Sequence, residues 1–123
     1  MKVFKDDVPI YLQLRQQIEE QILARALREE ESVKSLRVLA QEYKINPLTA
    51  ANAINLLVDE GILYQKRGIG VFVSTGARDQ IIKSRRGRFI EDTLVPAMQL
   101  AKRLEITEEE VIKKVRVIYG ENK

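Results

Sequence analysis

Residues 35–73 read SLRVLAQEYKINPLTAANAINLLVDEGILYQKRGIGVFV, a segment in which two helical patterns are followed by two strand patterns. Ser35 can cap a short helix, LRVLAQEYK, whose apolar residues recur at three- and four-residue steps. Asn46 as N-cap and Pro47 at the first helical position then begin the helix PLTAANAINLLVDE. The residues between the two helices form the tight connection that a helix-turn-helix needs.

The helical pattern stops at Gly61, a residue that suits the left-handed backbone after a helix. The runs ILYQK and VFVS, which follow, are rich in aliphatic and aromatic residues, and residues 67–70, RGIG, separate them. Two such runs around a Gly-containing loop predict a β-hairpin.

An amphipathic helix over about residues 9–27 is predicted upstream, from the helical spacing of its apolar residues. Pro9 opens this helix, and Asp7 is its expected N-cap. Helix, short helix, tight turn, helix and hairpin, in that order, predict a winged helix-turn-helix, which we assign to residues 1–75. The expected fold is mainly α with a small β-hairpin.

Residues 76–123 are expected to form further helices. A second apolar stripe contains Pro96, which either kinks one long helix or starts a new one. Thr107 and Glu110 have the spacing of a capping box for the last helix. Because these helices have few apolar neighbours, their stripe must bury against the winged domain or against another copy of the chain.

We expect burial against another copy, which makes residues 76–123 a short helical dimerisation region. Identical stripes that meet form a two-fold interface, and two recognition helices then reach a pseudo-palindromic DNA site. The alternative is a monomer whose stripe folds back onto its own domain. The residues predicted to form the dimer interface are Phe89, Ile90, Leu94, Met98 and Leu104.

Composition excludes several classes of protein. The 123 residues include no Cys, no His and no Trp, so disulfides, ordinary zinc sites and Ser–His or Cys–His nucleophile pairs are ruled out. We therefore expect no enzyme, no metal and no cofactor. No apolar run approaches the roughly 20 residues of a membrane-spanning helix. The start, MKVFKDDVPIYL, lacks the pattern of a signal peptide, so we expect a cytoplasmic protein.

Positive charge gathers in the middle of the chain. From Lys34 to Arg88 there are ten basic and four acidic residues, whereas Glu-rich segments at 29–31 and 108–110 flank this region. A basic middle is typical of a protein that binds a polyanion. Mixed charges that only solvate a helical surface are the alternative, and for the cluster Lys83, Arg85, Arg86 and Arg88 both interpretations stay open.

Double-stranded DNA is the partner that this order of elements favours. In a helix-turn-helix the later helix enters the major groove, where Asn and Thr side chains suit adenine edges and thymine methyls. The loop RGIG places a cation at a tip whose glycines permit a close approach to phosphate or to the minor groove. The residues predicted to contact DNA are Lys34, Ser35, Arg37, Lys44, Asn46, Pro47, Thr49, Asn52, Lys66, Arg67, Gly68 and Gly70.

The segments PIYLQLRQQIEEQIL and 35–73 resemble the N-terminal winged helix of GntR-type bacterial transcription regulators. The remainder, including FIEDTLVPAMQLAKRLEITEEEVI, resembles the YtrA subfamily, which implies dimerisation without a large effector-binding domain. The family's phosphate-contacting Arg matches Arg37, with Ser35 before it. The Asn-Pro-x-Thr start of the family's recognition helix matches Asn46, Pro47 and Thr49. The wing-tip motif of the family matches Arg67, Gly68 and Gly70.

Two features depart from the family pattern. The acidic stretch RALREEESVKS replaces a segment that usually contains Gly-Asp and a Pro, and no Lys or Arg lies between Pro47 and Glu60. Salt-dependent affinity would then come from Lys34, Arg37, Lys44, Lys66 and Arg67.

The leading functional hypothesis is a homodimeric, sequence-specific transcriptional regulator, expected to be a repressor, that occupies a pseudo-palindromic operator. The alternative is a winged-helix module that binds protein and not DNA. Whether a small effector binds stays open, and any effector would have to shift the geometry of the two winged domains.

Overall fold

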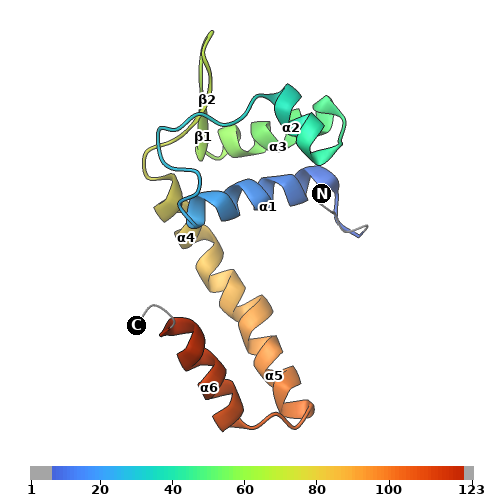
Figure 1. Cartoon of the computed structure of the whole chain (residues 1–123), viewed down its shortest axis with the longest axis vertical. Coiled ribbons are helices and arrows are strands. Elements are labelled where there is room, and N and C mark those ends of the chain that lie inside the picture. Colours follow the sequence, from blue (N-terminus) through green and yellow to red (C-terminus); the bar gives the residue numbers. More distant parts are fainter. Residues whose placement is uncertain (1–6, 121–123) are drawn as a thin grey trace. The chain divides into compact units, whose positions relative to one another are not determined.

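The computed structural model describes residues 7–120, so part of the N-terminal stretch examined for a signal peptide lies outside the described residues. The chain forms two compact units that divide between Lys83 and Ser84. Its elements, drawn in Figure 1, are α1 (Ile10–Leu23), α2 (Leu36–Tyr43), α3 (Pro47–Asp59), β1 (Leu63–Lys66), β2 (Gly70–Val73), α4 (Ala77–Phe89), the π-helical turn η1 (Ile90–Leu94), α5 (Val95–Arg103) and α6 (Glu108–Tyr119). The predicted mainly α fold with one small hairpin is confirmed.

Three of the predicted helix caps are present. The Ser35 hydroxyl accepts the Val38 N–H at 3.2 Å, and Asn46 Oδ1 accepts the Leu48 N–H at 2.8 Å. Thr107 and Glu110 form the capping box at the start of α6. Each cap satisfies an N–H that the first helical turn leaves without a partner.

The start of α1 differs from the expectation. Pro9, and not Asp7, occupies the N-cap position, and no side chain caps this helix. Pro9 has extended backbone with ψ 138°, so the helix begins one residue later than predicted and Asp7 lies too far upstream to cap it. The helix also ends at Leu23, because Arg25 adopts a left-handed φ of 63°.

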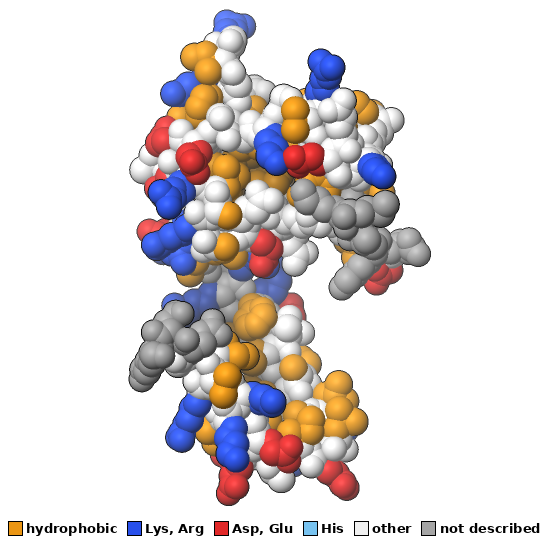
Figure 2. Space-filling model, in the orientation of Figure 1, with side chains coloured by type: hydrophobic (Ala, Val, Ile, Leu, Met, Phe, Trp, Pro, Cys, Tyr) orange, Lys and Arg blue, Asp and Glu red, His pale blue; other side chains and the backbone are white. Residues whose placement is uncertain are grey.

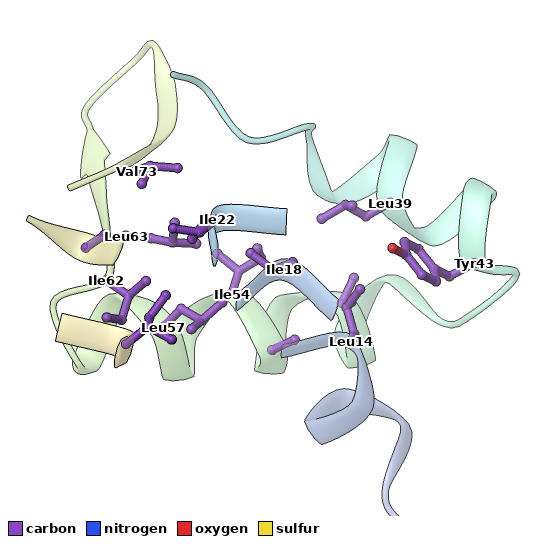
Figure 3. Packing of buried hydrophobic residues seen from close by; sticks show 14 residues of the cluster. Leu14, Ile18, Ile22, Leu39, Tyr43, Ile54, Leu57, Ile62, Leu63 and Val73 are labelled. Carbon is purple, nitrogen blue, oxygen red and sulfur yellow. The ribbon is translucent and has the colours of Figure 1, made fainter. Parts of the chain in front are cut away.

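The hydrophobic core of the first unit lies between α1, α2, α3 and the hairpin (Figure 3). Burial of one large aliphatic side chain stabilises a fold by about 1.5–3 kcal/mol. In α3 the residues facing this core are Ala50, Ala53, Ile54 and Leu57. The small residues Ala50 and Ala53 come first along this buried face of α3, and the larger Ile54 and Leu57 follow. The opposite face of α3 is not part of the core.

The hairpin is antiparallel, with Leu63 opposite Val73 and Lys66 opposite Gly70. Residues 30–33 add a short third edge to it, through a bridge between Ser32 and Phe72. The Val33 N–H donates to the Val71 carbonyl at 2.8 Å. From the sequence, residues 30–33 look only like a polar break between helices. Their pairing with β2 cannot be read from the local pattern, because β2 lies about forty residues away in the chain.

The start of α4 belongs to the first unit. Ala77 and Ile81 are fully buried in its core, so this compact unit extends to Lys83, beyond residue 75 where the sequence motif ends. The recognisable sequence motif ends with the hairpin. The hydrophobic core, however, also needs the start of α4 to cover it.

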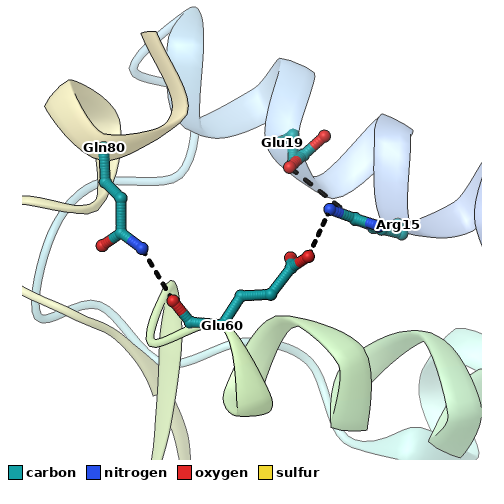
Figure 4. A network of polar contacts seen from close by, with 4 residues as sticks. All are labelled: Arg15, Glu19, Glu60 and Gln80. Carbon is teal, nitrogen blue, oxygen red and sulfur yellow. Dashed lines mark hydrogen bonds and ion pairs between the residues drawn. The ribbon is translucent and has the colours of Figure 1, made fainter. Parts of the chain in front are cut away.

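A polar network connects three helices of this unit (Figure 4). The Arg15 guanidinium donates to the Glu60 carboxylate at 2.6 Å, and its Nε lies 3.8 Å from the carboxylate of the buried Glu19. Gln80 donates to the Glu60 carbonyl at 2.7 Å. The side chains come from α1, the end of α3 and α4, so the network fixes their spacing in a way that apolar contacts alone do not.

The second unit has a continuous helical backbone from α4 through η1 into α5. The Val95 N–H donates to the Ile90 carbonyl, five residues back, which is the π-helical pattern. Pro96 has no N–H for the Asp92 carbonyl and its ring would clash with that carbonyl in a regular α-helix, and the wider π turn accommodates both effects. Of the two predicted outcomes, the structure shows one helix with a local distortion.

Between residues 84 and 120 no side chain is buried. Large apolar side chains are exposed there, including Phe89 at 54%, Met98 at 47% and Leu104 at 63%. Within the described residues no helix has the length and apolar character to cross a membrane.

We predict that Ile81→Ala destabilises the first unit by about 2–5 kcal/mol, because it removes a fully buried side chain and leaves a cavity. Urea unfolding followed by circular dichroism measures the change. Lys83→Ala, one half-turn on and exposed, is the matched control and should stay within about 0.5 kcal/mol of the wild type. Equal stability of the two variants would contradict the placement of α4 in the core.

Candidate nucleic-acid interface

The turn between α2 and α3 sets the direction of the second helix. Lys44 takes a left-handed φ of 55° at the end of α2, and the Ile45 N–H donates to the Ala40 carbonyl at 3.0 Å. Asn46 then caps α3 and Pro47 begins it. All three side chains predicted here, Lys44, Asn46 and Pro47, are exposed.

The outer face of α3 begins with Leu48, followed by Asn52 and Asn55, which are also exposed. Thr49 is half-buried, so it turns partly toward the core although Asn52 does not. Asn46 uses its carboxamide oxygen for the cap, so only its NH₂ group can face a partner.

The N-termini of α2 and α3 suit an anion. Neither helix has an acidic residue in its first turn, whereas α6 has three. The partial positive charge at a helix start attracts phosphate when no carboxylate competes. Arg37 lies in the first turn of α2 and is exposed, beside the capping residue Ser35.

Lys34 differs from the other predicted cations because its ammonium is already paired. Its Nζ lies 2.6 Å from the Glu42 carboxylate on α2. The Lys34 side chain is 59% exposed, and an exposed pair of this kind is worth about 0–1 kcal/mol. A phosphate can therefore displace Glu42 at low cost.

The hairpin presents the predicted wing residues at its tip. Arg67, Gly68 and Gly70 are exposed, and Gly68 needs a left-handed φ of 77° for the turn. The Lys66 ammonium lies 4.6 Å from the Phe72 ring centroid, which holds this cation on the strand by a cation–π contact. Ile69, between the two glycines, is 73% exposed and was not among the predicted site residues.

The predicted DNA contacts all lie on α2, α3, the turn between them, the two residues before α2 and the hairpin. In Figure 1 these elements lie on one side of α1. Figure 2 shows blue Lys and Arg side chains on this side, one of them at the tip of the hairpin. Among residues 7–120 no group of acidic side chains could hold a metal ion.

Glu30 anchors the hairpin to the segment before α2, a role that sequence reasoning missed. Its carboxylate accepts hydrogen bonds from the Thr75 hydroxyl at 2.6 Å and from the Tyr64 hydroxyl. These bonds, that from Thr75 first, hold the pKa of Glu30 below its usual range. The bond to Glu30 raises the pKa of Tyr64. No local pattern indicates a contact between residues this far apart in the chain.

Glu30→Gln keeps the side-chain size and removes the charge. Because folding lowers the pKa of Glu30, its carboxylate stabilises the fold above the unfolded value of about 4.3, and this contribution disappears as the pH falls through the folded value. We expect the wild type to have a higher urea midpoint than Glu30→Gln near pH 7 and the difference to shrink as the pH falls below the unfolded value. Glu29→Gln, exposed and adjacent, is the control, and a pH-independent difference would exclude the carboxylate as the cause.

Comparison with known proteins identifies the family. A family model described as bacterial regulatory proteins, gntR family, matches residues 10–73. The HTH-type transcriptional repressor NagR of Bacillus subtilis is 33% identical over 97 residues, which are 79% of this chain and 40% of NagR. The HTH-type transcriptional repressor YtrA of the same organism is 31% identical over 81 residues, which are 66% of this chain and 62% of YtrA.

Solved structures agree with this result. A GntR family transcriptional regulator from Listeria monocytogenes has a TM-score of 0.69 at 25% identity, with 92% of this chain and 97% of that chain covered. The DNA-binding domain of AraR, solved in complex with operator ORX1, has a TM-score of 0.54 at 25% identity, over 60% of this chain and 90% of that chain. The family model covers more than half of the sequence, and the chain therefore belongs to the GntR family of bacterial regulatory proteins, with YtrA among its relatives.

Proposed function

We propose that the protein is a homodimeric repressor that binds a pseudo-palindromic operator in a sequence-specific manner. The observation that carries this proposal is the exposed start of α3, which has no acidic residue in its first turn and lies next to Lys44 in the chain. Arg37 at the start of α2 and Arg67 at the wing tip supply further cations for phosphate. Two relatives, NagR and YtrA, are named repressors, which supports repression by operator occupancy.

The dimer is proposed from the exposed apolar side chains of the second unit. Phe89, Ile90, Leu94, Met98 and Leu104 are each at least 40% exposed. Exposed apolar side chains that gather on one surface mark an interaction site. Paired with the same surface of a second chain, it would place two winged domains on half-sites about one DNA turn apart, or a multiple of it.

This proposal places the protein in the bacterial cytoplasm, where the operator lies. A small effector, where one binds, would act by changing the spacing of the two winged domains, because the operator fixes the spacing that binds best.

A protein-interaction module is the second candidate function. It is favoured by the absence of Lys and Arg from α3 and by the 68% exposure of Leu48 on the same helix. Such a module would still bind its protein partner after Arg37 and Arg67 are substituted.

Fluorescence anisotropy across a salt series separates the two functions. The probes are a duplex selected by the protein from a random pool and a scrambled duplex of equal composition. We expect a preference of about a thousandfold or more, with affinity falling steeply as salt rises. Arg37→Glu should weaken binding and lower the slope of log affinity against log salt by about one unit per subunit.

Lys102→Glu, at the end of α5, changes the net charge by the same amount and is the matched control. Equal weak binding to both duplexes, or an unchanged slope in Arg37→Glu, would reject the DNA function in favour of the protein-interaction module.

Sedimentation velocity tests the dimer. We expect the wild type to sediment as a dimer and to dissociate on dilution, and Leu94→Asp with Met98→Asp to weaken association by at least about a hundredfold, because both charges would be buried in the interface. Gln99→Glu on the same helix is the control. A wild type that stays monomeric at every concentration would contradict the proposal.

A further inference from the structure

Leu48 is a large apolar side chain in an unusual position. It follows Pro47 at the start of α3 and is 68% exposed. Among the exposed large hydrophobic residues between positions 7 and 83, only Leu48 and Ile69 exceed half exposure. Leu48 contributes nothing to the core, because the residues of α3 that are buried begin with Ala50.

The exposed face of α3 beyond Leu48 is polar and uncharged. Asn52 and Asn55 lie one and two turns further along the same exposed face. No charged residue occurs in α3 before Asp59, the last residue of the helix. The face that would enter the major groove therefore carries one aliphatic side chain followed by two carboxamides.

Each of these groups has a preferred base. The C5 methyl of thymine is an apolar group in the major groove. Adenine forms a bidentate contact with an Asn carboxamide, in which N6 donates to the amide oxygen and N7 accepts from the amide NH₂. Guanine is read most often by Arg or Lys, and α3 has neither. The helix is thus built to read A·T pairs.

We propose that Leu48 is a specificity-determining residue that contacts the C5 methyl of one thymine in each half-site, with Asn52 and Asn55 reading adenines beside it. The inference rests on the proposed DNA function and names the base pairs that this function recognises. The Lys and Arg side chains around α3 then supply the affinity for DNA. The helix α3, which has no Lys or Arg, supplies the discrimination between base pairs.

The test removes only the methyl group. Each thymine of the selected duplex is replaced in turn, in both half-sites, by deoxyuridine, which keeps the Watson–Crick edge and lacks the C5 methyl. Binding is measured for the wild type, Leu48→Ala and Leu48→Met. Because Leu48 is exposed, both variants should unfold at the same urea concentration as the wild type, which a parallel melt verifies.

We expect one thymine position at which deoxyuridine weakens wild-type binding about fourfold per half-site, about fifteenfold for both, as loss of one buried methyl predicts. Leu48→Ala should bind the two duplexes equally at that position. Leu48→Met, which keeps an aliphatic side chain of similar volume, should retain most of the difference.

The outcomes separate this inference from the function on which it rests. Specific binding with no methyl dependence at any position, or methyl dependence that Leu48→Ala retains, would overturn the role of Leu48 and leave the regulator intact. Failure to select any duplex would remove both, and would favour a protein partner for the exposed leucine.

Discussion

The packing of α3 against α1 and the hairpin supports every other feature of the winged unit. Ala50 and Ala53 make the buried row of α3 narrow at its start, and Ile54 and Leu57 fill the core further along. Because this one face is buried, the opposite face, with Leu48, Asn52 and Asn55, is exposed to solvent. Arg15 and Glu60 add a charged bond between the same two helices near the end of α3. The position of α3, the helix proposed to contact the bases, is thus set by residues that are not among the proposed DNA contacts.

Local features of this fold could be predicted from the sequence, and distant ones could not. Ser35, Asn46 and Thr107 cap the helices expected of them, since a cap depends only on the next three residues. The third edge at residues 30–33 and the burial of Ile81 depend on partners far away in the chain. Their residues look like a polar loop and an ordinary helical position, so periodicity alone cannot find them.

The properties of the candidate site also divide into those that the sequence predicts and those that it does not. Residue type and order place Arg37, Asn52 and Arg67 on the exposed surface of the motif, as the structure also has them. The N-cap role of the Asn46 carboxamide oxygen follows from the sequence, whereas the pairing of Lys34 with Glu42 does not. The sequence places Leu48 among the first residues of the recognition helix, but it gives no reason to prefer Leu48 over its neighbours. Its 68% exposure in the structure identifies it as a surface group.

The short third edge of the hairpin also bears on how the chain avoids association through its strands. Residues 30–33 bond to β2, so in the described part of the chain β1 is the strand with an open side. That strand has four residues and ends in Lys66. A long, flat and apolar edge is a template for unwanted pairing with other chains, whereas a short one that ends in a charge is a poor template. The wing can therefore project from the domain, with Ile69 at its tip, without offering a surface for strand-by-strand aggregation.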